Sequence, residues 1–538
     1  MDVTTLNTLL YNQLYQDYLI DPPKLAPFLP DYKTCNWSRC AQIIAAPSEL
    51  HAQVKKYLIE QNSDLRSDRA HYYLDQLQHP RCVMVVTGQQ LGLLASPLYT
   101  IYKSLTTIKL VERLNGICPE AIFIPVFWLE SEDHDYDEVN HFGLWDNEFN
   151  PQQLIYGGSS RGKVSLRHYQ MGAEITQLLD NLKSSILPTE FTPELLSSIT
   201  EIFKPGQNWV YAARLFLKYL FEDMGLLFFQ PGDKKIKKLS SSFFDLLLEK
   251  SADTTRIFAD TSDDLLGRGY ANQVPVIPGK TFIHFENESG QREHLYSDSD
   301  GFYLKDSARR FSKEQAKKLI NRFPDRVSSS VISRPLLQSW LLPVVAYVAG
   351  PAEIAYWAQL GNLFNSLNLR MPVVYPRITA TLIEPKIARF IQKHQPDIEH
   401  IVLRKTDFLH DYFKTTWKVS GNDPIQNLRV LLSEKSEDIR KYIQNLDPTL
   451  LGVSEKVFQR ISDQIDLLQD KMIKAREQKE SQLTSHLEQI HQAIFPDQQP
   501  QERYISIIYF LNKFGPGITG KISAGLQVET FQHQVVNL

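Results

Sequence analysis

Two short apolar segments joined by one helical segment constrain the fold more than any other feature of the sequence. Residues 82–86 and 121–128 are rich in β-branched and aromatic side chains, a composition typical of buried strands. Between them, apolar residues recur at helical spacing, with Ser96 as the predicted N-cap, Pro97 at the first helical position and Asn115-Gly116 at the end. This pattern predicts a βαβ unit, in which a helix joins two parallel strands.

Both predicted strands end in polar residues. The first runs into residues 87–90, and the second runs into residues 130–141, which hold a dense group of carboxylates and two histidines. Parallel strands joined by a crossover helix end at the same edge of a sheet, where open α/β folds bind ligands. We therefore expect the two polar segments to face one cleft, with Gln90 and Asp133 on the same side of the molecule.

The acidic segment after the second strand is the strongest chemical signal. A general base and ligands for a hard cation such as Mg²⁺ are offered by Glu132, Asp133, His134, Asp135 and Glu138. A zinc site would need a clearer spacing of histidines and cysteines, so no dedicated metal site is predicted. The alternative is a solvated acidic loop, but its position after a strand of the βαβ unit favours a function.

The composition limits the classes of partner. The 538 residues are enough for several domain-sized units, and 43% of them are hydrophobic, which allows sizeable cores. Lys and Arg number 58 against 62 Asp and Glu, so neither a large nucleic-acid footprint nor a polybasic membrane surface is indicated. Small molecules or other proteins are the expected partners.

The cysteines favour a reducing compartment. Four thiols in so long a chain do not form a disulfide framework, and the amino terminus lacks the pattern of a signal peptide. No apolar stretch approaches the roughly 20 residues that a membrane helix needs, so we expect a cytoplasmic protein. Cys35 and Cys40 are candidate metal ligands, but ordinary half-buried thiols explain them better.

Two further segments carry weaker signals. The lysines within 234–238 follow a strand-end loop and would suit a phosphate, but a solvated helix face explains them better. Gly350-Pro351 suits close approach of an anion to a helix start and plain turn geometry equally well. No G-x-G-x-x-G motif follows a predicted strand, and no G-x-x-x-x-G-K-[ST] motif occurs, so neither a standard dinucleotide site nor a P-loop is indicated.

Periodicity divides the chain into four predicted parts. Alternating helical and strand-like patterns predict an α/β protein, a parallel-sheet core with inserted connecting modules. The parts are the first portion of the core with amino-terminal helices (1–160), a connecting insertion (161–330), the second portion of the core (331–384) and a helical coiled-coil domain (385–538).

Several elements within these parts are specific enough to test. One helical face is predicted for Leu9, Leu10, Leu14 and Tyr18. A strand-like pattern of residues begins at residue 251. Strands are predicted at 226–229, 274–277 and 281–285, and one helix is predicted over 352–367.

Residues 454–494 have the pattern of a single long helix. Val457, Ile461 and Ile465 begin an apolar seam at steps of three and four residues. At 1.5 Å per residue the helix would be about 60 Å long, so it needs a partner along its length. Residues 428–446 can fold back on it, and a second copy of the chain can cover the rest. We expect a homodimer, and the alternative is an intramolecular hairpin alone.

Several unusual motifs, in order along the chain, resemble the bacillithiol biosynthesis cysteine-adding (BshC) family of cysteine ligases. They are V-T-G-Q-Q-x-G at 86–92 with P-L-Y-T-I-Y-K at 97–103, P-V-F-W at 125–128 leading to E-D-H-D at 132–135 and N-H at 140–141, G-P-A-E at 350–353 with Tyr356, the segment 372–377, and Q-E-R at 501–503 with the segment 509–513. The resemblance implies a Rossmann-like core related to class I aminoacyl-tRNA synthetases, connecting insertions and a carboxy-terminal coiled coil that forms a homodimer.

The resemblance also implies a reaction, the addition of cysteine to the amine of glucosaminyl-malate as the last step of bacillithiol biosynthesis. Forming an amide from a free carboxylate needs activation, so ATP is the expected cosubstrate and Mg²⁺ a candidate ion, although the two short nucleotide motifs of the synthetases are missing. The hypothesis makes Asp133, His134 and Lys103 catalytic, with Asp133 or His134 taking a proton from the attacking amine. The substrate-binding residues would be Thr87, Gln89, Gln90, Ser96, Tyr99, Glu132, Asn140, Gly350, Glu353 and Arg377.

Two other functions stay open on the sequence alone. One is a nucleotidyltransferase-like enzyme that forms a different amide or ester. The other is a non-catalytic assembly protein whose purpose is the long helical seam. Turnover of glucosaminyl-malate against other amines separates the first from the expected ligase, and the second predicts no ligand in the cleft of Gln89 and Asp133.

Overall fold

The computed structural model describes residues 3–6, 11–160, 162–403, 408–417 and 424–538. Contacts divide the chain into a first unit of residues 1–147, 151–382 and 501–538 and a second unit of residues 148–150 and 383–500. Leu9 and Leu10 of the predicted amino-terminal helix lie outside the described residues. Nearby, helix α1 (Gln13–Ile20) buries Leu14 and Tyr18, as their spacing predicts.

A five-stranded parallel sheet forms the centre of the first unit. Its order is β13, β12, β2, β3, β6. The strands are β2 (Cys82–Gln90), β3 (Ile122–Glu130), β6 (Leu227–Phe229), β12 (Val344–Ala349) and β13 (Val373–Pro376). Helix α5 (Leu98–Ile117) joins β2 to β3, so the predicted βαβ unit is confirmed, and the predicted strand at 226–229 belongs to the same sheet.

The boundaries of the βαβ unit differ from the prediction. Strand β2 continues through the expected loop to Gln90, because Gln89 and Gln90 pair with the end of β3. Ser96 is not the N-cap of α5, since the helix begins after a cis Ser96–Pro97 bond and Leu98 N–H donates to the Ile505 carbonyl. Asn115 does not end α5 either, because its side chain exchanges two hydrogen bonds with the backbone of Phe123 in β3.

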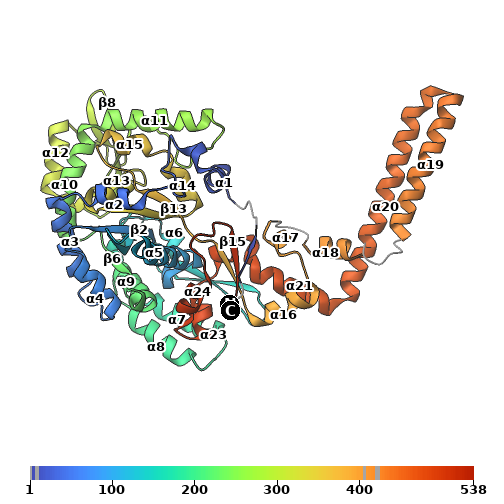
Figure 1. Cartoon of the computed structure of the whole chain (residues 1–538), viewed down its shortest axis with the longest axis horizontal. Coiled ribbons are helices and arrows are strands. Elements are labelled where there is room, and N and C mark those ends of the chain that lie inside the picture. The colour runs from blue at the N-terminus through green and yellow to red at the C-terminus, as the bar shows by residue number, and fades with distance from the viewer. Residues whose placement is uncertain (1–2, 7–10, 161, 404–407, 418–423) are drawn as a thin grey trace. The chain divides into compact units, whose positions relative to one another are not determined.

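The direction of the connections reverses in the middle of the sheet. From β2 the chain moves through α5 to β3, whereas from β12 it moves the opposite way to β13 through α14 (Pro351–Trp357) and α15 (Gly361–Ser366). Right-handed crossovers then place α5 and α14 on opposite faces of the sheet, as Figure 1 shows. The switch point lies between β2 and β12. The single helix predicted over 352–367 is wrong, because α14 and α15 are separate helices.

Further helices and short strands surround this sheet. Before it come α2 (Trp37–Ile44), α3 (Glu49–Gln61) and α4 (Asp68–Gln76), and after β3 come α6 (Tyr136–Val139), β4 (His141–Trp145), β5 (Pro151–Ile155), α7 (Glu174–Ser185), α8 (Thr192–Ile202) and α9 (Trp209–Phe221). A small sheet joins β1 (Val3–Leu6), β15 (His533–Asn537) and β14 (Ala380–Ile383).

The insertion builds a second five-stranded sheet, in the order β10, β9, β8, β7, β11, with antiparallel neighbours. The strands of this sheet are β7 (Lys280–Glu286), β8 (Arg292–Asp298), β9 (Gly301–Leu304), β10 (Arg309–Phe311) and β11 (Val327–Ser329). The helices in this part of the chain are α10 (Lys234–Glu249), α11 (Ser251–Gly267), α12 (Lys313–Arg322) and α13 (Ser333–Leu341). The strand predicted at 281–285 is confirmed within β7. Residue 251 instead begins a helix, and 274–277 is a loop, since Pro275 and Pro278 lack the N–H groups that a ladder needs.

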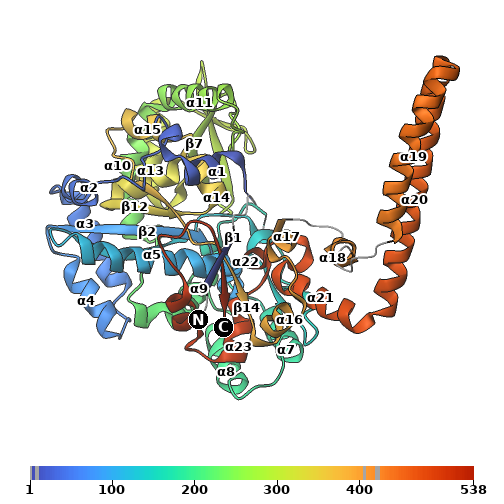
Figure 2. The same cartoon turned by 45° about the vertical axis from the view of Figure 1, so that its right-hand side comes forward.

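The second unit is helical. It contains α16 (Pro385–His394), α17 (Ile398–Leu403), α18 (Phe408–Trp417), α19 (Pro424–Leu446), α20 (Leu451–Lys479) and α21 (Ser481–Ile494). Helices α19 and α20 lie side by side as a hairpin in Figures 1 and 2, so the predicted partner at 428–446 is confirmed. The long helix predicted over 454–494 is broken at Glu480. No described helix in either unit is both long and apolar enough to span a membrane.

The carboxy-terminal segment returns to the first unit. It forms α22 (Gln501–Tyr504), α23 (Ile507–Phe514), α24 (Ile518–Gly525) and β15. Arg377, directly after β13, makes two hydrogen bonds with the Glu502 carboxylate, from Nη1 at 3.0 Å and from Nη2 at 2.6 Å, and both side chains are buried. Burial opposes ionisation of Glu502, but Arg377 outweighs it and lowers the Glu502 pKa. This ion pair joins the last segment of the chain to the central sheet.

Replacing Glu502 by Gln should destabilise the protein by about 3–5 kcal/mol, because the buried Arg377 guanidinium loses its counterion. Urea-induced unfolding of Glu502→Gln measures the loss. As a control, Glu249→Gln removes the ion pair between Lys317 and Glu249 at the surface and should shift the unfolding midpoint little. Equal unfolding midpoints for Glu502→Gln and the unaltered protein would contradict the assignment.

Candidate active site

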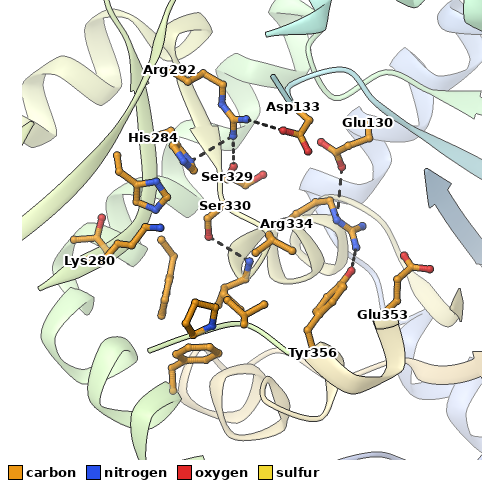
Figure 3. Close-up of a pocket in the computed structure, with 18 of the residues that line it drawn as sticks. Glu130, Asp133, Lys280, His284, Arg292, Ser329, Ser330, Arg334, Glu353 and Tyr356 are labelled. Carbon is orange, nitrogen blue, oxygen red and sulfur yellow. Dashed lines mark hydrogen bonds and ion pairs between the residues drawn. The ribbon is translucent and has the colours of Figure 1, made fainter. Parts of the chain in front are cut away.

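A cavity of about 360 Å³ lies at the carboxyl edge of the central sheet. The ends of β2 and β3, the start of α14 and the β7–β8 hairpin with its preceding loop line it. It is therefore next to the switch point between β2 and β12, where open α/β folds bind ligands. In Figure 3, Glu130 and Glu353 lie on one side of the cavity and Lys280 and His284 on the other.

The two polar segments meet as the βαβ topology predicts. Gln90 Nε2 donates to Asp133 Oδ2 at 2.6 Å, and both residues line the cavity together with Gln89 and His134. The other Asp133 oxygen accepts the backbone N–H of His134 at 2.7 Å. Gln90 Oε1 is buried and has no hydrogen-bond partner among the described residues, so it is free to accept from a ligand.

Lys103 is buried and does not line the cavity. Its side chain is 1% exposed, and Nζ donates to the Gly88 carbonyl, to Gln89 Oε1 at 3.1 Å and to Glu353 Oε2. Glu353 also accepts from Gly350 N–H at 2.8 Å and from the Tyr347 hydroxyl at 2.6 Å. Lys103 therefore positions Gln89 and Glu353, which do reach the cavity.

Glu130 is an acid with an unusual pKa at the end of β3. Burial raises the pKa of Glu130 to about 7, even though Arg334 Nε lies 3.6 Å from the carboxylate and opposes the shift. Burial, Asp135 and Asp133 also raise the pKa of Glu138 to about 7, although more of Glu138 is in contact with solvent. A carboxyl group with a pKa near neutrality suits a general base at physiological pH.

Arg292 fixes the protonation pattern of two histidines. It donates to Nδ1 of His134 at 3.2 Å and to Nδ1 of His284 at 3.4 Å. A guanidinium only donates, so each Nδ1 must accept, and the proton of each neutral ring is on Nε2. Burial and then Arg292 also lower the pKa of both rings. His134 is therefore arranged as an N–H donor and has no free lone pair with which to take a proton.

The other predicted site residues lie outside the cavity lining. Arg377 is paired with Glu502, and Glu132 is paired with Lys237 in a buried ion pair. Thr87 donates to the Val348 carbonyl, Tyr99 accepts from Gln89 at 3.4 Å, and Asn140 contacts His141. Ser96 is buried before the cis bond, and Gly350 is the N-cap of α14. Among the lysines within 234–238, Lys237 is therefore buried and ion-paired, whereas the others are exposed, as predicted for a solvated helix face.

The sequence did not indicate several residues that line the cavity. Lys280, His284, Arg292 and His294 come from the insertion, and Arg334 comes from α13. Arg334 Nη1 is buried and lacks a hydrogen-bond partner among the described residues. The one signal available was the predicted strand at 281–285, which contains His284, but its alternating pattern did not show which face would meet the core.

Neither the acidic segment nor the pair of Cys35 and Cys40 forms a group of metal ligands in the part of the chain that the structure describes. No group of three or more His, Cys, Asp or Glu side chains there has a metal-binding arrangement. The Sγ atoms of Cys35 and Cys40 are 3.5 Å apart, and both thiols are half-buried away from the cavity.

Comparison with known proteins gives matches over nearly the whole chain. The family model "Bacillithiol biosynthesis BshC, N-terminal Rossmann-like domain" matches residues 1–378, and "Bacillithiol biosynthesis BshC, C-terminal coiled-coil domain" matches residues 380–538. A Salinibacter ruber protein named "Putative cysteine ligase BshC" is 30% identical and covers 98% of this chain and 96% of its own length. Proteins of the same name from Desulforamulus reducens (30% identical, 94% and 93% covered) and Bacillus licheniformis (28% identical, 100% of both) are also similar.

The raised pKa of Glu130 predicts a pH-dependent effect on stability. The folded protein holds this proton from the ordinary pKa of 4.5 up to about 7, whereas the unfolded chain releases it, so stability falls with rising pH in that interval. Glu130→Gln cannot release this proton. Its free energy of unfolding, relative to that of the unaltered protein, should therefore rise by up to about 3 kcal/mol above pH 7. Thermal unfolding midpoints across pH measure the difference, and a difference that does not change with pH would contradict the prediction.

Proposed function

The chain belongs to the bacillithiol biosynthesis BshC family, and we propose on this premise that it is the ligase that joins the carboxyl group of cysteine to the amine of glucosaminyl-malate, the last step of the pathway. The observation that carries the proposal is the cavity at the switch point. It brings Glu130, with a pKa near 7, together with cationic side chains in a space suited to a small zwitterionic substrate. The name of the Salinibacter ruber relative, "Putative cysteine ligase BshC", supports the proposal.

The chemistry needs an activated carboxyl group and a deprotonated amine. A free carboxylate does not form an amide in water unaided, so we propose that ATP transfers a phosphoryl or adenylyl group to the cysteine carboxylate. The acceptor amine then displaces this group, forms the amide and releases one proton. Mg²⁺ would arrive with the nucleotide phosphates, which it commonly accompanies.

Glu130 is the best candidate for the base that takes this proton. Its pKa of about 7 lets it be ionised at physiological pH and still accept a proton from an ammonium or amine. Asp133 stays the second candidate, and its carboxylate is already held by Gln90 and by the backbone of His134. The free atoms of Gln90 and Arg334 are proposed to bind polar groups of the substrates.

The exposed apolar side chains of the hairpin support a homodimer. They are Leu428, Val430, Leu431, Ile439, Tyr442 and Leu446 on α19 and Val453, Val457, Ile461, Leu467 and Leu468 on α20. Exposed apolar surface of this extent on two long helices is typical of a protein–protein interface. We propose that a second copy of the chain covers it.

Turnover tests the reaction and the base together. The purified chain with cysteine, glucosaminyl-malate and ATP should form the amide product, detected by mass spectrometry, with kcat rising through pH about 7 as Glu130 loses its proton. Glu130→Gln should lower kcat by about 10²–10⁴-fold, the usual contribution of a general base. Asp137→Asn changes an exposed carboxylate nearby and serves as control. No product from the unaltered protein would reject the reaction, and full turnover by Glu130→Gln would reject the base.

Sedimentation tests the dimer. The unaltered protein should sediment at twice 62.0 kDa, and Leu431→Glu combined with Ile461→Glu should sediment at 62.0 kDa, because charges in the apolar surface oppose association. Gln444→Glu adds the same charge at an exposed polar position of α19 and should leave the mass unchanged. A dimer that survives the double substitution would place the interface elsewhere.

A further inference from the structure

The β7–β8 hairpin brings positive charge to one side of the cavity. Lys280 lines the cavity, and among the described residues its ammonium group has no hydrogen-bond or ion-pair partner. Desolvation accordingly lowers the pKa of Lys280. Arg292 is buried, and its only ion pair within the described residues is a loose one, at 3.7 Å to Asp133 Oδ1. A cation that faces a cavity without a counterion is suited to bind an anionic ligand.

Neutral hydrogen-bond donors accompany these cations. Because Arg292 occupies Nδ1 of His134 and of His284, the Nε2–H groups of both rings are the donors that remain. His294 packs on His284 with ring centroids 3.7 Å apart, and burial and then Lys280 lower its pKa to about 3. The rings are therefore uncharged and can donate to an anion without repelling Lys280.

The opposite side of the cavity carries two carboxyl groups. Glu130 is at the end of β3, and Glu353 is at the start of α14. Arg334 lies between them, with Nε 3.6 Å from Glu130, and Lys103 pairs with Glu353. Figure 3 shows Glu130 and Glu353 facing Lys280 and His284 across the cavity. The two sides of the cavity therefore differ, since the carboxyl groups of Glu130 and Glu353 lie opposite the unpaired ammonium group of Lys280.

The acceptor of the proposed reaction has a matching polarity. Glucosaminyl-malate carries an amine on its sugar and two carboxylates on its malate group. We propose that Lys280 and the imidazole N–H group of His284 on the β7–β8 hairpin, together with the imidazole N–H group of His134 from the segment after β3, form the subsite for the malate carboxylates. This assignment rests on the proposed function and adds the orientation, in which the amine points toward Glu130 and the carboxylates point away from it.

Steady-state kinetics of Lys280→Ala tests the subsite. The KM for glucosaminyl-malate should rise about tenfold to a hundredfold, as expected for one charge-assisted hydrogen bond, with kcat changed less than about twofold. Lys280→Arg should restore most of the affinity. Lys318→Ala, at an exposed lysine of α12 in the same insertion, should leave KM unchanged. The dimethyl ester of the acceptor keeps the amine but lacks both charges, so its KM should not respond to Lys280→Ala.

Other kinetic outcomes would overturn the assignment. An unchanged KM for the acceptor in Lys280→Ala would reject the subsite. A raised KM for ATP with an unchanged KM for the acceptor would also reject it, because the basic side would then bind phosphates. An equal rise in the KM for the dimethyl ester and in the KM for the acceptor would show that Lys280 does not bind the carboxylates.

Calorimetric titration with glucosaminyl-malate alone separates this inference from the proposed function. Binding that Lys280→Ala weakens at least about tenfold supports the subsite even when no amide is formed with cysteine and ATP. Amide formation with equal acceptor affinity in both proteins supports the reaction and rejects the subsite. The absence of any binding to the unaltered protein would reject both.

Discussion

The cavity depends on one buried cation. Lys103 projects from α5, the crossover helix, and its ammonium group contacts the Gly88 carbonyl and Gln89 in β2 and the carboxylate of Glu353 in α14. An ammonium group in such a buried position is stable only while these partners surround it. The three elements are therefore held together, and the spacing between the end of β2 and the start of α14 is set by their shared contact with Lys103. Glu353 and Gln89, which both contact Lys103, line the cavity.

The two sides of the cavity have separate structural origins. The acidic residues follow strands of the parallel sheet, so the hydrogen bonds of that sheet determine their positions. The basic residues are on the antiparallel β7–β8 hairpin, where Arg292 is anchored by Ser328 Oγ and the Ser329 carbonyl of β11. Changes in the insertion can therefore alter what the cavity recognises while the sheet and the proposed base stay in place.

The sequence predicted the elements whose positions follow from topology. The meeting of Gln90 with Asp133 required only that two parallel strands end at one edge, and the structure places a hydrogen bond between them. The presence of Lys280 and Arg292 in the cavity could not be predicted from the sequence, because their position depends on how the β7–β8 sheet packs against the central sheet. Local patterns also misled where tertiary contacts decide, since Ser96 has the composition of an N-cap but precedes a cis proline, and Pro275 prevents the strand that its neighbours favour.

The return of the carboxy-terminal segment has a consequence for biosynthesis. A ribosome makes the chain from the amino terminus, so β13 and Arg377 are synthesised before the whole of α19, α20 and α21, and Glu502 comes only afterwards. Until then, the Arg377 guanidinium lacks its carboxylate and β14 lacks the neighbouring strand β15. The first unit therefore completes its packing only after the whole helical hairpin has been synthesised.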